Sequence, residues 1–515
     1  MISHRISNFT TLEIHTTAED IRASLDLADV IAGNIVERSS TQGHDKRGAP
    51  VIPLGVPENQ EDDWKNDSEN PRNWSVSKKW ASAVVVSLYT FVGPLATSMM
   101  APGLPEIAEK YHITNETVVA LSLSIFLIPF GVAPLILAPL SEMYGRRWVL
   151  NIGNLINIGF SIGCAFAPTT GTLLVFRFLS GISSSAPIAC GVGVISDLFS
   201  ERERAAAMAM YSLGPFISPV VGPITGGFIA ETIGIKYVFI IVASLGGVAS
   251  VVGIPVLRET YAPLIQLRRA KGRVDSENTA PEVFLLREFL NNKRLVLWSR
   301  LRLPAVRLFS SPTCFLLSLY MAFTDGIYYL MLATFSNLFS TMYGFNTGTV
   351  GLTYLGLGVG FILATVVGAP SLNKVYIHNG KGEPEMRIPG LIFGALFVPV
   401  GLFWYGWSAA EKLHWIMPII GSGIFGFGMM CTFPPTQLYL IETFTPAESA
   451  LFAASVFRSL LGFAFPLFGQ QLFDALGMGG GNSLLGGCAI ILGIPFPIYL
   501  YYYGAAIRAN SDLTR

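Results

Sequence analysis

Three charged residues stand inside long apolar stretches of the sequence: Arg177, Asp325 and Arg458. Moving a charge into hydrocarbon costs at least about 2.5–3.5 kcal/mol, so each of these residues needs a structural or a functional reason. Asp325 shares a helical face with Tyr328 and Tyr329, which follow it by three and four residues. A carboxyl group in such apolar surroundings is a candidate site for a proton or a cation. The alternative is that Asp325 accepts hydrogen bonds from Thr324 or a neighbouring helix and serves packing alone.

The two arginines and one glutamine add to this set. Arg177 could bond to backbone carbonyl groups as a structural brace, and for Arg458 we favour the same role. Gln437 is a polar residue in a stretch that is otherwise rich in aromatic and methionine side chains, which could form an apolar cavity wall. From the residues alone, the candidate cavity residues are Asp325, Tyr328, Tyr329 and Gln437.

Three prolines recur every fourth residue in one apolar stretch, and a row of small residues runs one position ahead of them. The prolines are Pro215, Pro219 and Pro223, and the row is Gly214, Ser218, Gly222 and Gly226. In water, each proline inside a helix costs about 3 kcal/mol because it removes a backbone hydrogen bond. In a membrane, neighbouring helices compensate the backbone, and small residues four apart allow two helices to pack closely. The pattern therefore predicts a membrane helix.

Hydropathy windows of about 20 residues predict an all-α membrane protein with twelve transmembrane helices. The predicted spans lie near residues 80–101, 117–138, 148–167, 171–193, 205–230, 236–257, 312–339, 348–372, 388–408, 413–438, 448–473 and 484–506. The long gap between the sixth and seventh spans divides them into two six-helix halves. The predicted segments are a largely disordered cytoplasmic tail (1–79), an N-terminal half (80–257), a cytoplasmic linker with an amphipathic helix (258–311), a C-terminal half (312–506) and a cytoplasmic C-terminal tail (507–515).

The predicted loop between spans two and three reads Ala138-Pro-Leu-Ser-Glu-Met-Tyr-Gly-Arg-Arg147. Its glycine permits a tight turn, and the two arginines place fixed positive charges at one membrane surface. Two acidic residues at the end of span four, Asp197 and Glu201, are candidate partners for them. An ion pair that forms only when the two halves close on this side would bias the conformational equilibrium, whereas the alternative is ordinary anchoring of the arginines at the surface. The candidate gating residues are Glu142, Gly145, Arg146, Arg147 and Asp197.

The distribution of positive charge predicts that both termini are cytoplasmic. With that orientation, the outer loops carry only three basic residues, Lys110, Lys236 and Lys412, and the other loops and the tails carry nearly all the rest. Asn115 begins the one glycosylation sequon that would face outward, so it is a candidate modification site, although it lies close to span two.

The composition agrees with a membrane protein and excludes several classes of function. Only 13% of the residues are charged and the net charge is zero, so nucleic acid is not an expected partner. The five cysteines show no metal-binding spacing, and we expect no metal and no cofactor. The sequence lacks a nucleophile–base pair and a nucleotide-binding glycine loop, so we expect neither an enzyme nor a pump driven by ATP.

The arginine loop and the proline-rich stretch together resemble the major facilitator superfamily. Leu140, Glu142, Gly145, Arg146 and Arg147 match that family's loop signature, while Ala138 replaces its leading glycine. The stretch around Pro215 resembles the family's antiporter signature, in which Gly214, Gly222, Pro223, Gly226 and Gly227 are in register. The resemblance implies the major facilitator fold, with alternating access by rocking of the two halves. It also implies that Arg177 faces the central cavity. The small residues of span eight, Gly356, Gly360, Ala364 and Gly368, would meet those of span five between the halves; the alternative is that they pack within one half.

Three further motifs narrow the resemblance to fungal drug:proton antiporters. They are Asn70-Pro-Arg-Asn-Trp74, Glu259-Thr-Tyr-Ala-Pro263 and Pro384-Glu-Met-Arg-Ile-Pro389. The likeness implies a multi-pass plasma-membrane protein, expected to be a monomer, that exports a hydrophobic or amphipathic small molecule such as a drug, toxin or secondary metabolite against protons. The alternatives are transport of a cationic metabolite such as a polyamine, for which Asp325 would be the counter-charge, uptake of a nutrient, and a receptor that does not transport.

Overall fold

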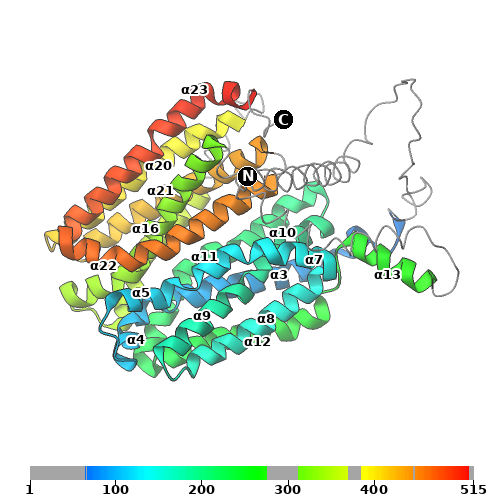
Figure 1. Cartoon of the computed structure of the whole chain (residues 1–515), viewed down its shortest axis with the longest axis horizontal. Coiled ribbons are helices and arrows are strands. Elements are labelled where there is room, and N and C mark those ends of the chain that lie inside the picture. Colours follow the sequence, from blue (N-terminus) through cyan, green and yellow to red (C-terminus); the bar gives the residue numbers. More distant parts are fainter. Residues whose placement is uncertain (1–63, 65, 275–310, 369–383, 445–446, 510–515) are drawn as a thin grey trace, which may run out of the picture. The chain divides into compact units, whose positions relative to one another are not determined.

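The computed structural model describes residues 64, 66–274, 311–368, 384–444 and 447–509, and in these ranges the chain is helical, with short connections (Figure 1). The tail before residue 64 and the predicted amphipathic helix of the linker lie outside the described residues. The helix α13 (Ala262–Val274) is the part of the linker that the structure describes.

The N-terminal half contains six spans, two of which are broken. Pro134 follows the second of two breaks in span two, and Pro187 follows the break in span four, as expected where a proline removes a helical hydrogen bond. A short outer helix, α4 (Leu104–Lys110), follows the first span. The six spans are α3 (Val76–Ser98), α5 (Glu116–Ser124) with α6 (Leu127–Val132) and α7 (Pro134–Tyr144), α8 (Arg146–Ala165), α9 (Thr170–Ser184) with α10 (Ala186–Leu198), α11 (Glu201–Ile233) and α12 (Ile235–Val256).

The C-terminal half is built in the same way. Its helices are α16 (Pro312–Tyr343), α17 (Thr347–Thr353) with α18 (Leu355–Leu363) and the π-helical turn η4 (Ala364–Gly368), α20 (Ile388–Ala410), α21 (Ile416–Thr443), α22 (Ala447–Gly493) and α23 (Pro495–Ala509). The long helix α22 is interrupted at Gly477, where the backbone has φ 70° and ψ 167°. Because glycine adopts such angles without strain, the chain reverses there between two spans.

Within the described residues, ten helical segments are long and apolar enough to cross a membrane, and the bent pair Glu116–Val132 and Pro134–Tyr144 supplies an eleventh span. One of the ten, Ala450–Arg508, is 59 residues long. A single crossing needs only about 20 residues, so this segment, broken at Gly477, provides two. We therefore count twelve spans.

The two halves are joined by hydrogen bonds at the predicted outer end of the bundle. The Glu231 carboxylate at the end of α11 accepts hydrogen bonds from the Asn346 side chain (2.6 Å) and the Gly348 backbone N–H (2.8 Å), which begin α17. The Ser336 hydroxyl of α16 donates to the Pro102 carbonyl (2.8 Å). The Gln471 amide of α22 donates to the hydroxyl of Thr117 in α5 (3.1 Å). The hydrogen bonds found between described residues of the two halves all lie at this end, so the predicted outer end of the bundle is closed.

The small-residue row of span five packs inside its own half. A Cβ atom at Gly222 would overlap the Ser98 hydroxyl of α3, and one at Gly226 would overlap the backbone of Met99. Gly227 instead faces the other half, since a Cβ there would lie 2.8 Å from the Thr347 carbonyl oxygen of α17. Successive residues of a helix point about 100° apart, so Gly226 and Gly227 meet different neighbours.

The row of span eight also packs within its half, and the prediction that it meets the row of span five is wrong. Cβ atoms at Gly356 and Gly360 would overlap the backbone of α21 at Ile419 and Gly423. Other glycines of span eight contact span five: a Cβ at Gly351 would lie 2.5 Å from the Pro223 carbonyl oxygen, and one at Gly358 would lie 2.5 Å from the Val220 side chain. Rows spaced by four residues identify close helix packing, but they do not identify the partner helix.

A methyl group at Gly226 should destabilise the protein because it would strike the backbone oxygen of Met99. We expect Gly226→Ala to lower the stability by about 1–3 kcal/mol, the usual cost of overpacking. The matched control is Gly247→Ala in α12, where no atom lies within 4 Å of the added carbon. The measurement is thermal unfolding of the purified protein in detergent, and equal melting temperatures for the two variants would contradict the packing described here.

Candidate functional site

Asp325 lies in the middle of α16 and is 9% exposed. The nearest opposite charge is Arg458 of α22, whose Nε atom lies 3.9 Å from the Asp325 Oδ2 atom. This separation is too long for a hydrogen bond, so the two groups attract each other without direct contact. The structure thus places the two intramembrane charges of the C-terminal half together, a pairing that the sequence analysis missed.

A signal for this pairing was present in the sequence. Spans seven and eleven both run from the predicted cytoplasmic side, and Asp325 and Arg458 stand thirteen and eleven residues after the starts of α16 and α22. At 1.5 Å per residue, these positions lie at similar depths of about 20 and 17 Å. Opposite charges at one depth inside a membrane are expected to pair. The Arg458 guanidinium also lies over the Phe433 ring of α21, 5.1 Å from its centroid.

Tyr328 and Tyr329 lie beside the Asp325–Arg458 pair. Their ring centroids are 5.0 Å apart, and the Tyr328 ring also packs against Phe361 of α18 at 5.8 Å. Tyr329 lies close enough to Asp325, Arg458 and Arg177 to interact electrostatically with all three. Gln437 is half-buried on α21, and no contact found between described residues joins it to Asp325.

Arg177 takes the structural role of a brace in this conformation, rather than the cavity position that the resemblance implied. Its side chain is fully enclosed, with 1% exposure. Its guanidinium donates to the carbonyl oxygens of Ala96 in α3 (3.2 Å), Ser122 in α5 (3.2 Å) and Leu123 in α5 (3.3 Å). These bonds tie α9 to two neighbouring spans, and they offset the cost of placing the charge in hydrocarbon.

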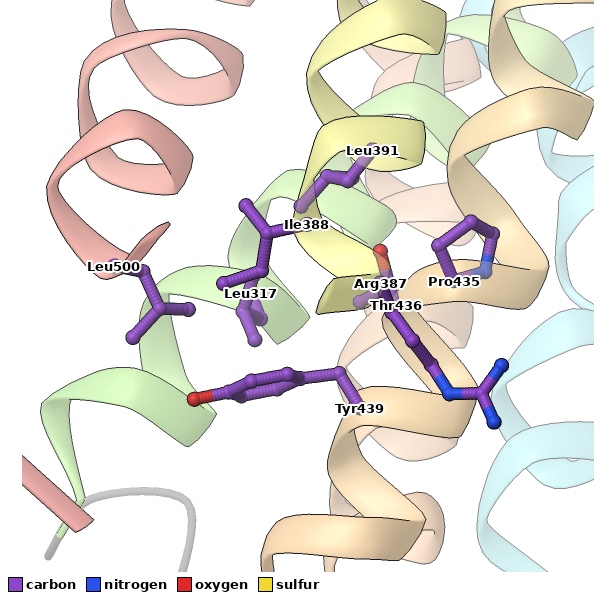
Figure 2. Close-up of a pocket in the computed structure, with 8 residues that line it drawn as sticks. All are labelled: Leu317, Arg387, Ile388, Leu391, Pro435, Thr436, Tyr439 and Leu500. Atoms are coloured by element: carbon purple, nitrogen blue, oxygen red, sulfur yellow. The ribbon is translucent and has the colours of Figure 1, made fainter. Parts of the chain in front are cut away.

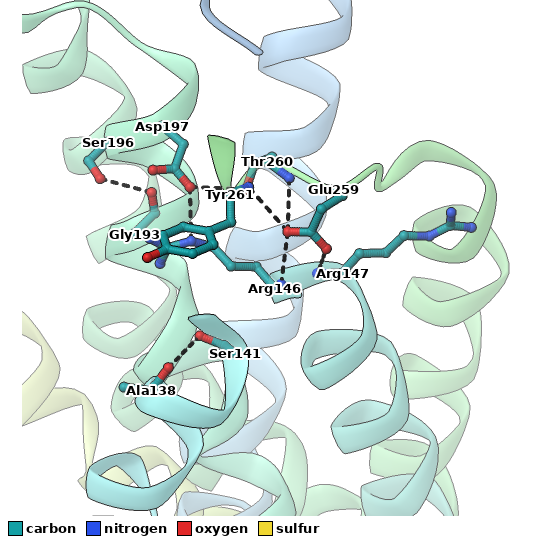
Figure 3. Close-up of polar contacts among 10 residues, drawn as sticks. All are labelled: Ala138, Ser141, Arg146, Arg147, Gly193, Ser196, Asp197, Glu259, Thr260 and Tyr261. Atoms are coloured by element: carbon teal, nitrogen blue, oxygen red, sulfur yellow. Dashed lines mark hydrogen bonds and ion pairs between the residues drawn. The ribbon is translucent and has the colours of Figure 1, made fainter. Parts of the chain in front are cut away.

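The arginine loop forms an ion pair at the opposite end of the N-terminal half. The Arg146 Nε atom lies 2.8 Å from an oxygen of Asp197 at the end of α10, so the predicted partner is present. The Glu259 carboxylate, which follows α12, accepts hydrogen bonds from the backbone N–H groups of Arg146 (3.0 Å) and Arg147 (3.4 Å), as Figure 3 shows. A carboxylate is stabilised at a helix N-terminus, so Glu259 caps α8. The role of Glu259 as a helix cap was not predicted from the sequence.

Two glycines make room for this cluster. Gly145 has φ 110°, a conformation that favours glycine, and a Cβ atom there would overlap the Glu259 carboxylate. A Cβ at Gly193 of α10 would overlap the Arg146 guanidinium. Glu142 lies half-buried near the end of α7. The sequence suggested an ion pair that forms when the two halves close on each other. Asp197 and the arginines all belong to the N-terminal half, however, so their ion pair forms within one half.

The two best-formed pockets lie elsewhere, in the C-terminal half where α16 begins. The first has an empty volume of about 180 Å³ and is lined by Leu317, Arg387, Ile388, Leu391, Pro435, Thr436, Tyr439 and Leu500 (Figure 2). The second, of about 240 Å³, shares Tyr439 with it. Neither pocket is lined by a predicted cavity residue.

Asn115 is exposed and caps α5, since its side-chain oxygen accepts a hydrogen bond from the Thr117 backbone N–H (2.9 Å). Its glycosylation stays a prediction.

A family model described as Major Facilitator Superfamily matches residues 86–466, which is most of the chain. The chain belongs to the major facilitator superfamily. Among curated members, it is 41% identical over 477 residues to the "MFS transporter cpaT" of Aspergillus oryzae, covering 91% of this chain and 96% of that protein. It is 36% identical over 487 residues to the "Efflux pump radE" of Floropilus chiversii, covering 90% and 88%.

The fold of this facilitator also matches solved structures. The xylose transporter XylE of E. coli, in a conformation described as partially occluded inward open, superposes with a TM-score of 0.62 and covers 83% of this chain and 98% of its own. The two sequences are 15% identical, so the match concerns the fold alone.

Gly193→Ala should break the ion pair of this facilitator's arginine loop, because the added methyl group would occupy the position of the Arg146 guanidinium. We expect a loss of about 1–3 kcal/mol in thermal unfolding. The loss should shrink when Asp197→Asn is already present, since the pair is then already broken. Gly159→Ala in α8, with no atom within 4 Å of the new carbon, is the control. Additive effects of the Gly193 and Asp197 changes would contradict the coupling.

Proposed function

We propose that this chain is a proton-coupled antiporter that exports a hydrophobic or amphipathic small molecule, such as a secondary metabolite or a drug. The direction is supported by the near full-length similarity to a fungal efflux pump. The aromatic side chains beside Asp325 and Arg458, which are Tyr328, Tyr329 and Phe433, suit a cargo of low polarity.

The Asp325–Arg458 pair carries the proposal of proton coupling. It holds a carboxyl group inside the membrane, 3.9 Å from a cation and without a hydrogen bond from a described residue. When Asp325 gains a proton, the net charge of the pair changes from zero to plus one. Such a change in a site of low polarity alters its affinity for a ligand and its interaction with nearby charges.

The remaining parts of the proposal concern orientation and gating. Both termini lie in the cytoplasm, and the protein works as a monomer in the plasma membrane. The arginine loop at the cytoplasmic end takes part in conformational gating from within the N-terminal half, where the Arg146–Asp197 pair holds α8 to α10. Spans five and eight meet where Gly227 faces α17, and this contact serves as a pivot near the closed outer end. The residues of the proposed gate are Glu142, Gly145, Arg146, Arg147 and Asp197.

In fungal cells that overexpress the chain, we expect lower accumulation of a toxic hydrophobic compound and higher resistance, measured with a panel of such compounds. A protonophore should abolish the difference, because the proton gradient drives export. Asp325→Asn should reduce the protonophore-sensitive efflux to the level of cells without the chain. Asp474→Asn, a change at an exposed carboxylate of α22, is the matched control.

Two outcomes would contradict the proposal. Sensitivity that rises with expression would indicate uptake, and efflux that persists in the presence of the protonophore would exclude coupling to protons.

A further inference from the structure

The charges of Asp325 and Arg458 are left with unused hydrogen-bonding capacity. An N⁺–H···O⁻ contact is ordinarily about 2.7–2.9 Å long, whereas these groups stand 3.9 Å apart. Among the hydrogen bonds between described side chains, none engages the Asp325 carboxylate or the Arg458 guanidinium. Asp325 is nevertheless nine-tenths buried, and polar groups buried to that degree almost always have partners.

A guanidinium group offers five N–H donors in one plane, and a carboxylate accepts through two oxygens. Side by side, the Asp325 carboxylate and the Arg458 guanidinium can bind one ligand together: the carboxylate accepts a hydrogen bond from it, and the guanidinium donates one to it. A ligand that bonds to both residues must carry a hydrogen-bond donor next to a hydrogen-bond acceptor. Primary and secondary amides, lactams, protonated carboxylic acids and hydroxyketones have that arrangement.

The balance of charge decides against a cation at this site. Asp325 attracts a positive ligand, but Arg458 repels it from almost the same distance, so the attraction is largely cancelled. Arg177 of α9, which interacts electrostatically with the same Tyr329 as the pair does, adds a second positive group. The other titratable neighbours, Tyr328 on α16 and Tyr354 between α17 and α18, are neutral phenols.

The surroundings favour a flat, mostly apolar molecule. The Phe433 ring lies on one side of the Arg458 guanidinium, at 5.1 Å. Tyr329 borders the site near the N-terminal half, since a Cβ at Gly462 would lie 3.0 Å from the Tyr329 ring and 3.3 Å from Leu127 of α6. A ligand bound here would thus contact aromatic rings on its faces and the charge pair at its edge.

We infer that the Asp325–Arg458 pair is the polar contact of the substrate site, and that it recognises an uncharged group in which a hydrogen-bond donor stands beside an acceptor. The inference rests on the proposed export function, and it names the substrate class as neutral, flat and amide-like instead of cationic. A proton on Asp325 turns its charged acceptor into a neutral carboxyl group, which binds the substrate's donor more weakly, so proton and substrate compete for the same carboxylate, as antiport requires.

The test compares three probes of similar size on the purified full-length protein: naphthamide, N,N-dimethylnaphthamide and naphthylmethylammonium. The first carries a donor and an acceptor, the second only an acceptor, and the third is a cation. The dissociation constants are measured by calorimetry or by quenching of tryptophan fluorescence. We expect naphthamide to bind about tenfold or more tightly than either of the others, as loss of one or two hydrogen bonds to charged groups predicts. This comparison needs no variant.

Variants then test the assignment to this pair. Arg458→Gln should weaken binding of naphthamide and strengthen binding of naphthylmethylammonium, because the Asp325 charge is no longer compensated. Asp325→Asn should weaken binding of naphthamide without a gain for the cation. Asp474→Asn is again the matched control and should bind all three probes as the unmodified protein does. Each variant is compared at temperatures below its own melting transition.

Three results would overturn the inference: tighter binding of the cation than of naphthamide to the unmodified protein, equal binding of naphthamide and its dimethyl analogue, or a preference that neither Asp325→Asn nor Arg458→Gln changes. The export experiment is separate. Export without the probe preference refutes this inference alone, whereas the probe preference without export refutes the proposed function and leaves a binding site.

Discussion

Hydrocarbon cannot hydrogen-bond, and this constraint governs the whole structure. Every backbone group and every charge inside the membrane must find its partner in the protein. Arg177 meets the requirement through three backbone carbonyl groups of neighbouring spans. In the proline-rich span, the Ser98 hydroxyl of α3 donates to the Ser218 carbonyl (2.9 Å), and the Ser218 hydroxyl contacts the Phe91 carbonyl in return (3.0 Å). The Asp325–Arg458 pair meets the requirement only in part, which is why it stands apart from the structural charges.

The same constraint explains what the sequence predicts well. Spans must be long and apolar, so hydropathy locates them, and the breaks follow proline and glycine. The pairing of Arg146 with Asp197 was also predictable, because both residues lie at the same membrane surface at the ends of adjacent spans.

Prediction fails where the neighbour of a helix must be known. Periodicity identifies a face of a helix, but it does not say which helix lies against that face. For this reason the small-residue rows were assigned to the wrong partners, although both rows do pack closely. The same difficulty applies to Arg177, because the sequence around an intramembrane arginine does not show whether its guanidinium bonds to backbone carbonyl groups or faces a cavity. The Asp325–Arg458 pair could have been found by comparing depths, which depend only on where each span begins.

The position of this pair connects binding with the closed outer end. Asp325 shares α16 with Ser336, which bonds to Pro102 of the other half, and Arg458 shares α22 with Gln471, which bonds to Thr117. The charge pair therefore lies about three turns below two of the hydrogen bonds that join the halves. Under the proposed function, a ligand that draws Asp325 and Arg458 together would change the spacing of α16 and α22, and the helices would carry that change to the end where the halves are joined. Opening of that end requires these two hydrogen bonds and those of Glu231 between α11 and α17 to break, so α16 and α22 link the charge pair to one part of the contact between the halves.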